Sequence, residues 1–166
     1  MLKVFTYLAL SLLYFSDDVS ADVLQDIRSA SRNKSCIVEY ELGREPAIAL
    51  AASGYDKPSI NQKELLGLIE EFIAAGCPID AEGSGGMSPI NLAVLRVEPE
   101  LLKVLLRHGA NPLLKVSKSK SWINGKGSLE FSKLVYEMRG GERREEIVRI
   151  IGAHIASQQP IGDNFA

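Results

Sequence analysis

The residues of this 166-residue sequence whose types could do chemistry are few and lie far apart. The two histidines, His108 and His154, have no third ligand near them at the spacing of a zinc site. His108 also falls on the last turn of an expected helix, where its side chain suits the negative end of the helix dipole. We therefore expect no metal site.

The glycine-rich stretch Gly83–Gly86 is the nearest approach to a phosphate-binding loop. No Lys-Ser or Lys-Thr pair follows it and no apolar strand precedes it, although a phosphate loop needs both. Ser84 and Ser88 also lack the G-x-S-x-G context of a catalytic serine. Because no catalytic set converges in the sequence, we expect a protein that is not an enzyme and that binds no cofactor.

Cys36 and Cys77 are the only two cysteines of the chain. In an exported protein they could form one disulfide, and two free thiols are the alternative. The sequence leaves both possibilities open.

The amino terminus has the order of a secretory signal peptide. Lys3 precedes an apolar run over residues 4–15, and the polar stretch SDDVSA ends in Ala21. A helix over that run would be about 18 Å long, too short for a bilayer core of about 30 Å. We expect cleavage after Ala21, a periplasmic or secreted mature chain, and no stable membrane insertion. An uncleaved anchor or a buried first helix is the alternative.

Composition and charge narrow the class of protein further. Apolar residues make up 46% and charged residues 24% of the chain, the usual mixture of a globular protein, and the net charge is −2. Nucleic-acid binding depends largely on a positive electrostatic field, which this chain lacks. We therefore expect no nucleic-acid partner.

A helical hairpin is the clearest structural signal, and it spans residues 86–112. Ser88 is a good N-cap residue and Pro89 suits the first helical position. A second apolar stripe runs over Leu101–Leu106, and Gly109 is placed to end that helix. The same order recurs around Gly76, 33 residues before Gly109, and a weaker pair follows up to Ala156.

At these residues the sequence resembles the ankyrin repeat. GMSPINLAV is similar to the family pattern G-x-T-P-L-H-x-A, with Ser88 for threonine and Asn91 for histidine, and LLKVLLRHGANP resembles the second helix and turn. The resemblance implies an all-α, ankyrin-like solenoid of about three helix–turn–helix repeats with connecting hairpin loops. The expected organisation is a signal peptide over 1–21, an N-terminal capping segment over 22–42, a repeat domain over 43–156 and a C-terminal tail over 157–166.

Two expectations concern the capping segment and Asn91. Residues 22–31 should form a short amphipathic helix, with Val23, Leu24 and Ile27 covering the first repeat. Asn91 is placed either for binding on an inner helix or, as a structural residue, for holding the start of its helix.

The resemblance also implies protein binding through hairpin tips and the exposed side of the first helices. A basic insertion over residues 115–127 surrounds the only tryptophan and carries an Asn124-Gly125 signal for a type I′ turn. Its tryptophan could anchor an interface or could fold back onto the third repeat. The expected protein-binding residues are Trp122, Lys118, Lys120, Met87, Glu82, Val94 and Tyr55.

These expectations favour an exported, monomeric, non-enzymatic module that binds another protein, and specifically a periplasmic immunity-type inhibitor of a toxin or envelope enzyme. One alternative is an envelope accessory scaffold, for example one that supports oxidative-stress defence. Another is an enzyme whose site assembles from the insertions at residues 54–62 and 115–127.

Overall fold

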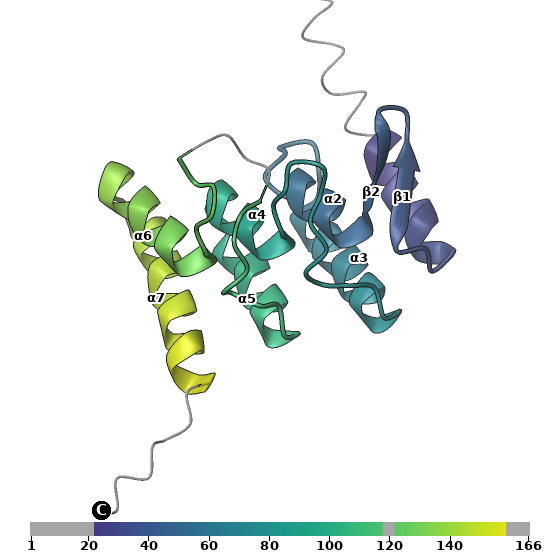
Figure 1. Ribbon diagram of the computed structural model, residues 1–166. Helices are drawn as coiled ribbons and strands as arrows, with labels where there is room; N and C mark the ends of the chain where they lie inside the picture. Colours follow the sequence, from purple (N-terminus) through teal and green to yellow (C-terminus); the bar gives the residue numbers. More distant parts are fainter. Residues whose placement is uncertain (1–21, 118–121, 159–166) are drawn as a thin grey trace, which may run out of the picture. The chain divides into compact units, whose positions relative to one another are not determined.

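The computed structural model describes residues 22–117 and 122–158, and the expected signal peptide and most of the expected tail lie outside them. The chain divides into two compact units, Met1–Pro78 and Ile79–Ala166. The boundary falls inside the range expected for the repeat domain. Both units are mostly helical, and the only regular sheet of the described residues is one two-stranded hairpin (Figure 1).

The first unit begins with a helix over residues 22–32 and continues through β1 (Ile37–Tyr40), β2 (Gly43–Pro46), α2 (Ala47–Gly54) and α3 (Gln62–Ala74). Its apolar core lies mainly on the three helices. The fully or nearly fully buried side chains include Ile27, Ala47, Ile48, Ala51, Ala52, Leu65, Ile69 and Phe72.

The helix over residues 22–32 packs against α3 as the amphipathic pattern predicts. Leu24 and Ile27 are buried, and Val23 is half-buried. On the rim, the Arg28 Nε donates to Glu64 Oε1 at 2.6 Å, and the Ser31 hydroxyl donates to the Glu71 carboxylate. The expectation for Leu24 and Ile27 is confirmed.

The β1–β2 hairpin is an element that the helical expectation missed. The two strands are antiparallel, with Ile37 opposite Pro46 and Tyr40 opposite Gly43, so a two-residue loop joins them. Val38 is fully buried. The hairpin occupies the end of the segment expected to cap the repeats and the first residues expected to belong to the repeat domain.

A disulfide joins Cys36 and Cys77, whose Cα atoms lie 5.1 Å apart. Cys36 directly precedes β1, and Cys77 is the second residue after Ala75, the C-cap of α3. The bond therefore fastens the hairpin and the helix before it to the end of α3. Of the two possibilities that the sequence leaves open, the structure has the bonded one.

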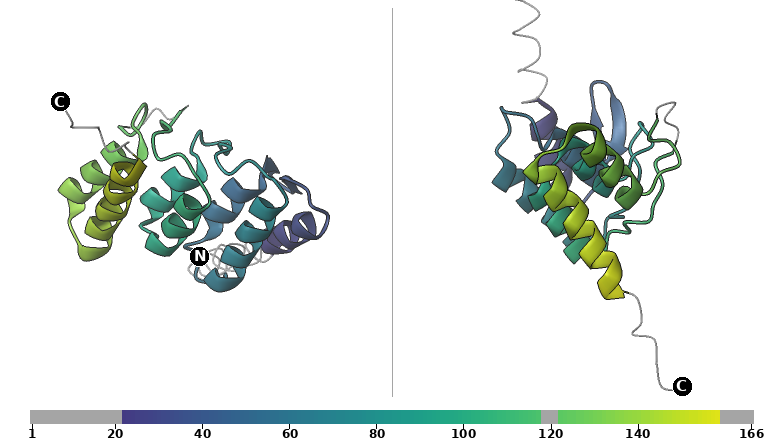
Figure 2. Two further views of the ribbon diagram at one scale, coloured as in Figure 1. Left: turned by 90° about the horizontal axis from the view of Figure 1, so that it is seen from below. Right: turned by 90° about the vertical axis from the view of Figure 1, so that its left-hand side faces the viewer.

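The second unit consists of two helix pairs. The first pair is α4 (Pro89–Arg96) with α5 (Pro99–Arg107), and the second is α6 (Ser128–Arg139) with α7 (Glu142–Gln158). α4 packs on α6 and α5 packs on α7, so like helices lie side by side. Figure 2 shows α6 and α7 as neighbours in both views. Together with α2 and α3, the helices lie in the three places where the sequence predicts helical hairpins.

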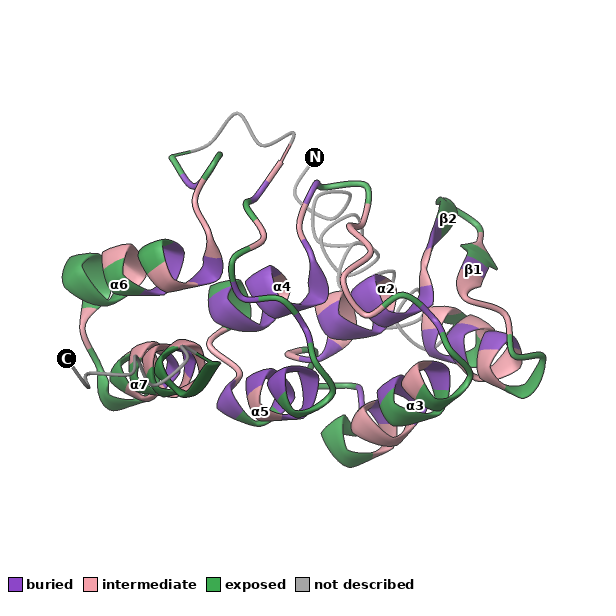
Figure 3. Cartoon of the chain, turned by 60° about the horizontal axis from the view of Figure 1, so that its bottom comes forward, coloured by how far each residue is buried: buried purple, intermediate pink, exposed green. Residues whose placement is uncertain are grey.

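Burial is uneven within the second unit, as Figure 3 shows. Six of the nine residues of α5 and five of the eight residues of α4 are buried. In contrast, α6 buries Ser128, Phe131 and Ser132, and α7 buries Ile147 and Ile151. The second pair thus has fewer buried residues per turn than the first.

The two glycines that the sequence sets 33 residues apart end their helices in the same way. Gly76 has φ 83° and Gly109 has φ 87°, the left-handed conformation that glycine adopts at little cost. At each, the glycine N–H bonds three residues back and the next N–H bonds five residues back, the pattern of a Schellman motif. The expectation that Gly109 ends a helix is confirmed.

Ser88 stands at the N-cap of α4 but does not act as expected. Its side chain makes no hydrogen bond to the helix, and its buried Oγ has no partner in the described part of the chain. Pro89 at the first helical position leaves one N–H fewer to satisfy, so α4 begins without a side-chain cap.

Candidate functional site

A small, mostly apolar hollow lies where the end of α4, the loop before α6, the end of α6 and the start of α7 meet. Its volume is about 80 Å³. This is well below the roughly 300–1,000 Å³ of typical small-molecule pockets. We call it the Trp122 hollow; it is lined by Leu95, Val97, Trp122, Val135, Met138, Arg139 and Arg144.

Trp122 covers one side of this hollow while half of its surface stays in solvent. Its ring meets the Phe131 ring edge to face, with centroids 6.0 Å apart and planes at 63°, and its exposed fraction is 51%. Phe131 itself is fully buried in α6. Trp122 therefore packs on α6, which is the folded-back alternative that the sequence allows for it, and half of its surface stays exposed.

The loop that carries Trp122 is held at its base. Lys115 and Gly127 form an antiparallel bridge, and the Val116 N–H donates to the Lys126 carbonyl at 3.0 Å. The Gly125 N–H in turn donates to the Val116 carbonyl at 2.9 Å. Because both sides of the loop are paired at this point, Trp122 projects from a fixed base.

The expected type I′ turn at Asn124-Gly125 is wrong. Such a turn needs positive φ at both central residues. Gly125 has φ 75°, but Asn124 is not among the described non-glycine residues of positive φ. The Lys126 N–H donates to the Ile123 carbonyl at 3.1 Å, so the turn has the pattern of type II.

The side chain of Asn91 anchors both ends of the same loop through two hydrogen bonds. Its Nδ2 donates to the Leu114 carbonyl at 3.2 Å, and its Oδ1 accepts from the Ser128 hydroxyl at 2.8 Å. Asn91 and Ser128 are fully buried. The structural role is therefore the correct one for Asn91, although it joins α4 to the loop and to the start of α6 instead of capping its own helix.

The charged residues of the Trp122 hollow are both arginines. Arg139 is exposed and makes no ion pair within the described part of the chain. One terminal nitrogen of Arg144 donates to the Gly140 carbonyl at 3.1 Å, and its buried Nε has no partner among the described residues. Since no acidic side chain lines the hollow, its charge is positive.

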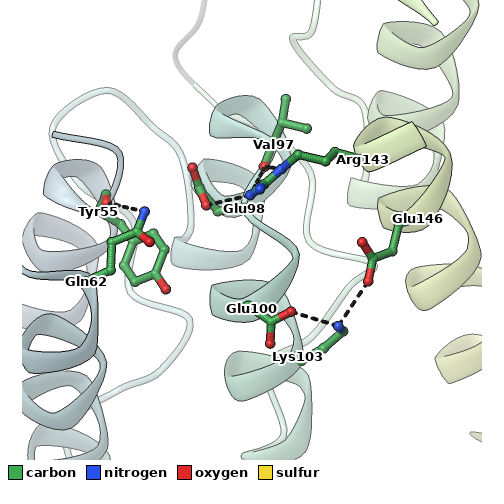
Figure 4. A network of polar contacts seen from close by, with 8 residues as sticks. All are labelled: Tyr55, Gln62, Val97, Glu98, Glu100, Lys103, Arg143 and Glu146. Carbon is green, nitrogen blue, oxygen red and sulfur yellow. Dashed lines mark hydrogen bonds and ion pairs between the residues drawn. The ribbon is translucent and has the colours of Figure 1, made fainter. Parts of the chain in front are cut away.

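Val97, which lines the Trp122 hollow, is held in place by hydrogen bonds from α7. Val97 has φ 61°, an unusual conformation for a β-branched residue, and it closes α4 as its left-handed cap. The Arg143 guanidinium donates to the Val97 carbonyl at 3.2 and 3.3 Å and to the Glu98 carboxylate at 3.1 Å (Figure 4). These bonds connect the first helix pair with the second.

A second ionic contact joins α5 to α7. The Lys103 Nζ lies 2.9 Å from Glu100 and 3.0 Å from Glu146 (Figure 4). The hydrogen bonds to these two carboxylates raise the pKa of Lys103. The hydrogen bond from Lys103 lowers the pKa of Glu146. The contact thus favours the charged form of both partners.

The prediction of a protein-binding role is wrong for Val94 and Tyr55, because both side chains are buried. Val94 is 2% exposed and lies with Ser132, Val135 and Ile147, since α6 covers the face of α4 that was expected to be free. Tyr55 is also 2% exposed, and its carbonyl accepts from the Gln62 side chain at 3.2 Å, which closes the loop between α2 and α3 (Figure 4).

The other expected binding residues have different outcomes. Met87 and Glu82 are half-buried, and the Glu82 carboxylate accepts a hydrogen bond from Ser117. Neither lines the Trp122 hollow. Lys118 and Lys120 lie outside the described residues.

The sequence did not single out Leu95, Met138, Arg139 or Arg144 as neighbours of Trp122. Leu95 and Met138 are 40% and 59% exposed, so both are apolar residues on the outer side of their helices. An apolar residue off the buried stripe is the only signal that could have pointed to them, and scattered exposed apolar residues are common.

No group of three or more His, Cys, Asp or Glu residues in the described ranges could hold a metal ion. His108 is exposed at the end of α5, and His154 contacts Gln158 on its own helix at 2.8 Å. Within residues 22–117 and 122–158, no helix is both long enough and apolar enough to cross a membrane.

No protein-family model matches the chain, and a search of curated proteins finds no match. Over residues 22–117 and 122–158, the structure is that of a mostly helical protein with one disulfide, three helix pairs and a small hollow lined by an exposed tryptophan.

Proposed function

We propose that this chain is an exported, non-enzymatic protein-binding module built from ankyrin-like helix pairs. The observation that carries the proposal is the half-exposed Trp122 over a small apolar hollow. Exposed aromatic residues on a rigid base are common anchors of protein interfaces, and the hollow is too small for a typical small-molecule ligand.

Two observations support the repeat architecture. In the second unit, α4 packs on α6 and α5 packs on α7, the neighbour-to-neighbour packing by which helical repeats bury their apolar faces. The identical glycine-closed ends at Gly76 and Gly109, 33 residues apart, fit the ankyrin spacing that the sequence resembles.

The Cys36–Cys77 disulfide supports export. Stable disulfides form and persist in secreted and periplasmic proteins and are rare in the reducing cytosol. A leader over residues 1–21 would bring the chain to such a compartment.

A periplasmic immunity-type inhibitor is the specific form of this function that we propose. A small binding module acts by occupying a surface of its partner, and blocking a toxin or an envelope enzyme needs no further chemistry. An accessory scaffold would use the same surface on a host protein.

The test is an affinity capture from the envelope fraction of the source cell, with the protein expressed from its full sequence and purified as the cell processes it. We expect one stoichiometric partner. Trp122→Ala should lose this partner, whereas Tyr136→Ala, which removes a partly exposed aromatic residue of α6 outside the hollow, should retain it.

Circular dichroism of both variants verifies that they remain folded. A toxin or envelope enzyme that is inhibited by the protein and released by Trp122→Ala would establish the inhibitor form. A partner whose activity is unchanged would favour the scaffold. Failure to capture any partner, or equal capture by both variants, would contradict binding at this surface.

A further inference from the structure

We propose that the Trp122 hollow binds an acidic segment of the partner protein, in which one large apolar side chain stands beside one or two carboxylates. This inference rests on the proposed protein-binding function and names the chemistry of the partner. It follows from the size of the hollow, the identity of its lining and the state of its two arginines.

The apolar half of the site fits one side chain. Leu95, Trp122, Val135 and Met138 line a volume of about 80 Å³ that is partly open to solvent. A Leu, Ile or Phe side chain placed there would remove water from the exposed parts of Trp122 and Met138, which are 51% and 59% exposed. Removal of apolar surface from water is the favourable contribution that this contact would make to binding.

The charged half selects against cations and for carboxylates. Arg139 and Arg144 both line the hollow, and neither forms an ion pair within the described part of the chain. The neighbouring Arg143, by contrast, is already engaged by Val97 and Glu98. A guanidinium offers parallel N–H donors that match a carboxylate. Arg144 keeps its hydrogen bond to the Gly140 carbonyl, but no acidic side chain among the described residues pairs with Arg139 or Arg144, so both charges are complementary to a carboxylate.

The base of the site is built to hold its shape. The Trp122 loop is pinned by the Lys115–Gly127 bridge, and the Val97 wall is held by the two bonds from Arg143. A partner segment therefore meets a surface that needs little rearrangement, which lowers the entropy cost of binding.

The only tryptophan of the chain lines the hollow, so its fluorescence reports occupancy directly. The probes are three sets of blocked, tryptophan-free synthetic peptides of equal length. The first sets Leu or Phe among Asp and Glu, the second sets the same residue among Lys, and the third sets Ser among Asp and Glu.

We expect the first set alone to shift the Trp122 emission to shorter wavelength in a saturable way. Arg139→Glu should weaken this binding roughly tenfold, since it replaces an attraction by a repulsion. Lys133→Glu makes the same charge change at an exposed position of α6 outside the hollow and should leave the affinity within about twofold. Higher salt should weaken the binding of the first set.

Equal responses to the acidic and basic sets, or no response to any acidic peptide at millimolar concentration, would overturn the proposal. So would a Trp122 emission that changes on deletion of residues 159–166 or on dilution, since these results would give the hollow to the chain's own tail or to a second copy. A captured partner that is lost by Trp122→Ala but retained by Arg139→Glu would leave the proposed function intact and refute this inference alone.

Discussion

The guanidinium of Arg143 in α7 donates two hydrogen bonds, of 3.2 and 3.3 Å, to the carbonyl of Val97. Val97 is the residue that ends α4 in a left-handed conformation. A β-branched residue at φ 61° is strained, and the contact shows how that strain is maintained. The second helix pair thus contacts the two residues between α4 and α5, at which the chain turns from one helix into the next.

This relationship gives a first prediction, for Val97→Gly. Glycine adopts positive φ without the Cβ clash, which costs other residues about 1–2 kcal/mol. Allowing for the greater freedom of glycine in the unfolded chain, we expect the free energy of unfolding to rise by about 0.5–1 kcal/mol. Urea unfolding measures the change. Lys34→Gly, at the other described non-glycine residue of positive φ, should act in the same direction, and a loss of stability at position 97 would contradict the strain.

The second prediction concerns the disulfide. Cys36 and Cys77 are separated by 41 positions, and a cross-link of this span stabilises a protein by about 4 kcal/mol in the chain-entropy treatment. We expect the Cys36→Ser, Cys77→Ser double variant to unfold at markedly lower urea concentration. The reducing agent dithiothreitol should lower the midpoint of the native protein and leave that of the double variant unchanged. Equal midpoints for the native and double-variant proteins without reductant would rule out this contribution.

The third prediction separates two buried polar residues of α4. Asn91→Ala removes the partner of the Leu114 carbonyl and of the Ser128 hydroxyl, and we expect a loss of about 2–3 kcal/mol. Ser88→Ala removes a buried hydroxyl without a partner, so we expect no loss or a small gain, whereas loss of a true N-cap would cost about 1 kcal/mol. Thermal unfolding of the two variants side by side makes the comparison.

The helices were accessible from sequence because their signals are local. The apolar stripe of Leu101–Leu106 and the glycine at position 109 define a helix and its end without any knowledge of the neighbours. The β1–β2 hairpin was missed because its strands are only four residues long and the second reads GREP, with little strand propensity.

The site was accessible only in part because its contacts are tertiary. Trp122 stands out as the single tryptophan in a basic loop, but its neighbours come from α4, α6 and α7. Val94 was expected on a free face of its helix, and only the packing of α6 on α4 buries it. Which outward residues meet depends on this packing, which no short stretch of sequence records.

The fourth prediction is a dependence of stability on pH. Lys103 lowers the pKa of Glu146, and Arg28 lowers that of Glu64, so the stability from these carboxylates is present above about pH 4.3, the pKa of an unperturbed glutamate. It should be lost as the pH falls through the lowered pKa values. The raised pKa of Lys103 acts in the opposite direction, and its contribution should be lost only in strong alkali, above about pH 10.4.

The measurement is the urea midpoint of unfolding between about pH 2 and pH 8. Glu146→Gln should lower the midpoint at neutral pH and have little effect at the acid end, where the native side chain is also protonated. Glu137→Gln, an exposed position of α6, serves as the matched control and should follow the native curve. A Glu146→Gln effect of the same size at both ends would contradict the ionic contribution.

The last prediction concerns the order in which the helix pairs open. α5 buries six of its nine residues, whereas α7 buries two of seventeen, so the second pair has fewer apolar contacts to hold its backbone hydrogen bonds. Because buried apolar contacts protect backbone hydrogen bonds from opening, we expect α6 and α7 to exchange amide hydrogens before α4 and α5. Hydrogen exchange followed by mass spectrometry resolves the four helices. Uniform protection would show that the pairs unfold as one unit, whereas faster exchange in α6 and α7 that slows when a partner occupies the Trp122 hollow would show that binding orders the weaker pair.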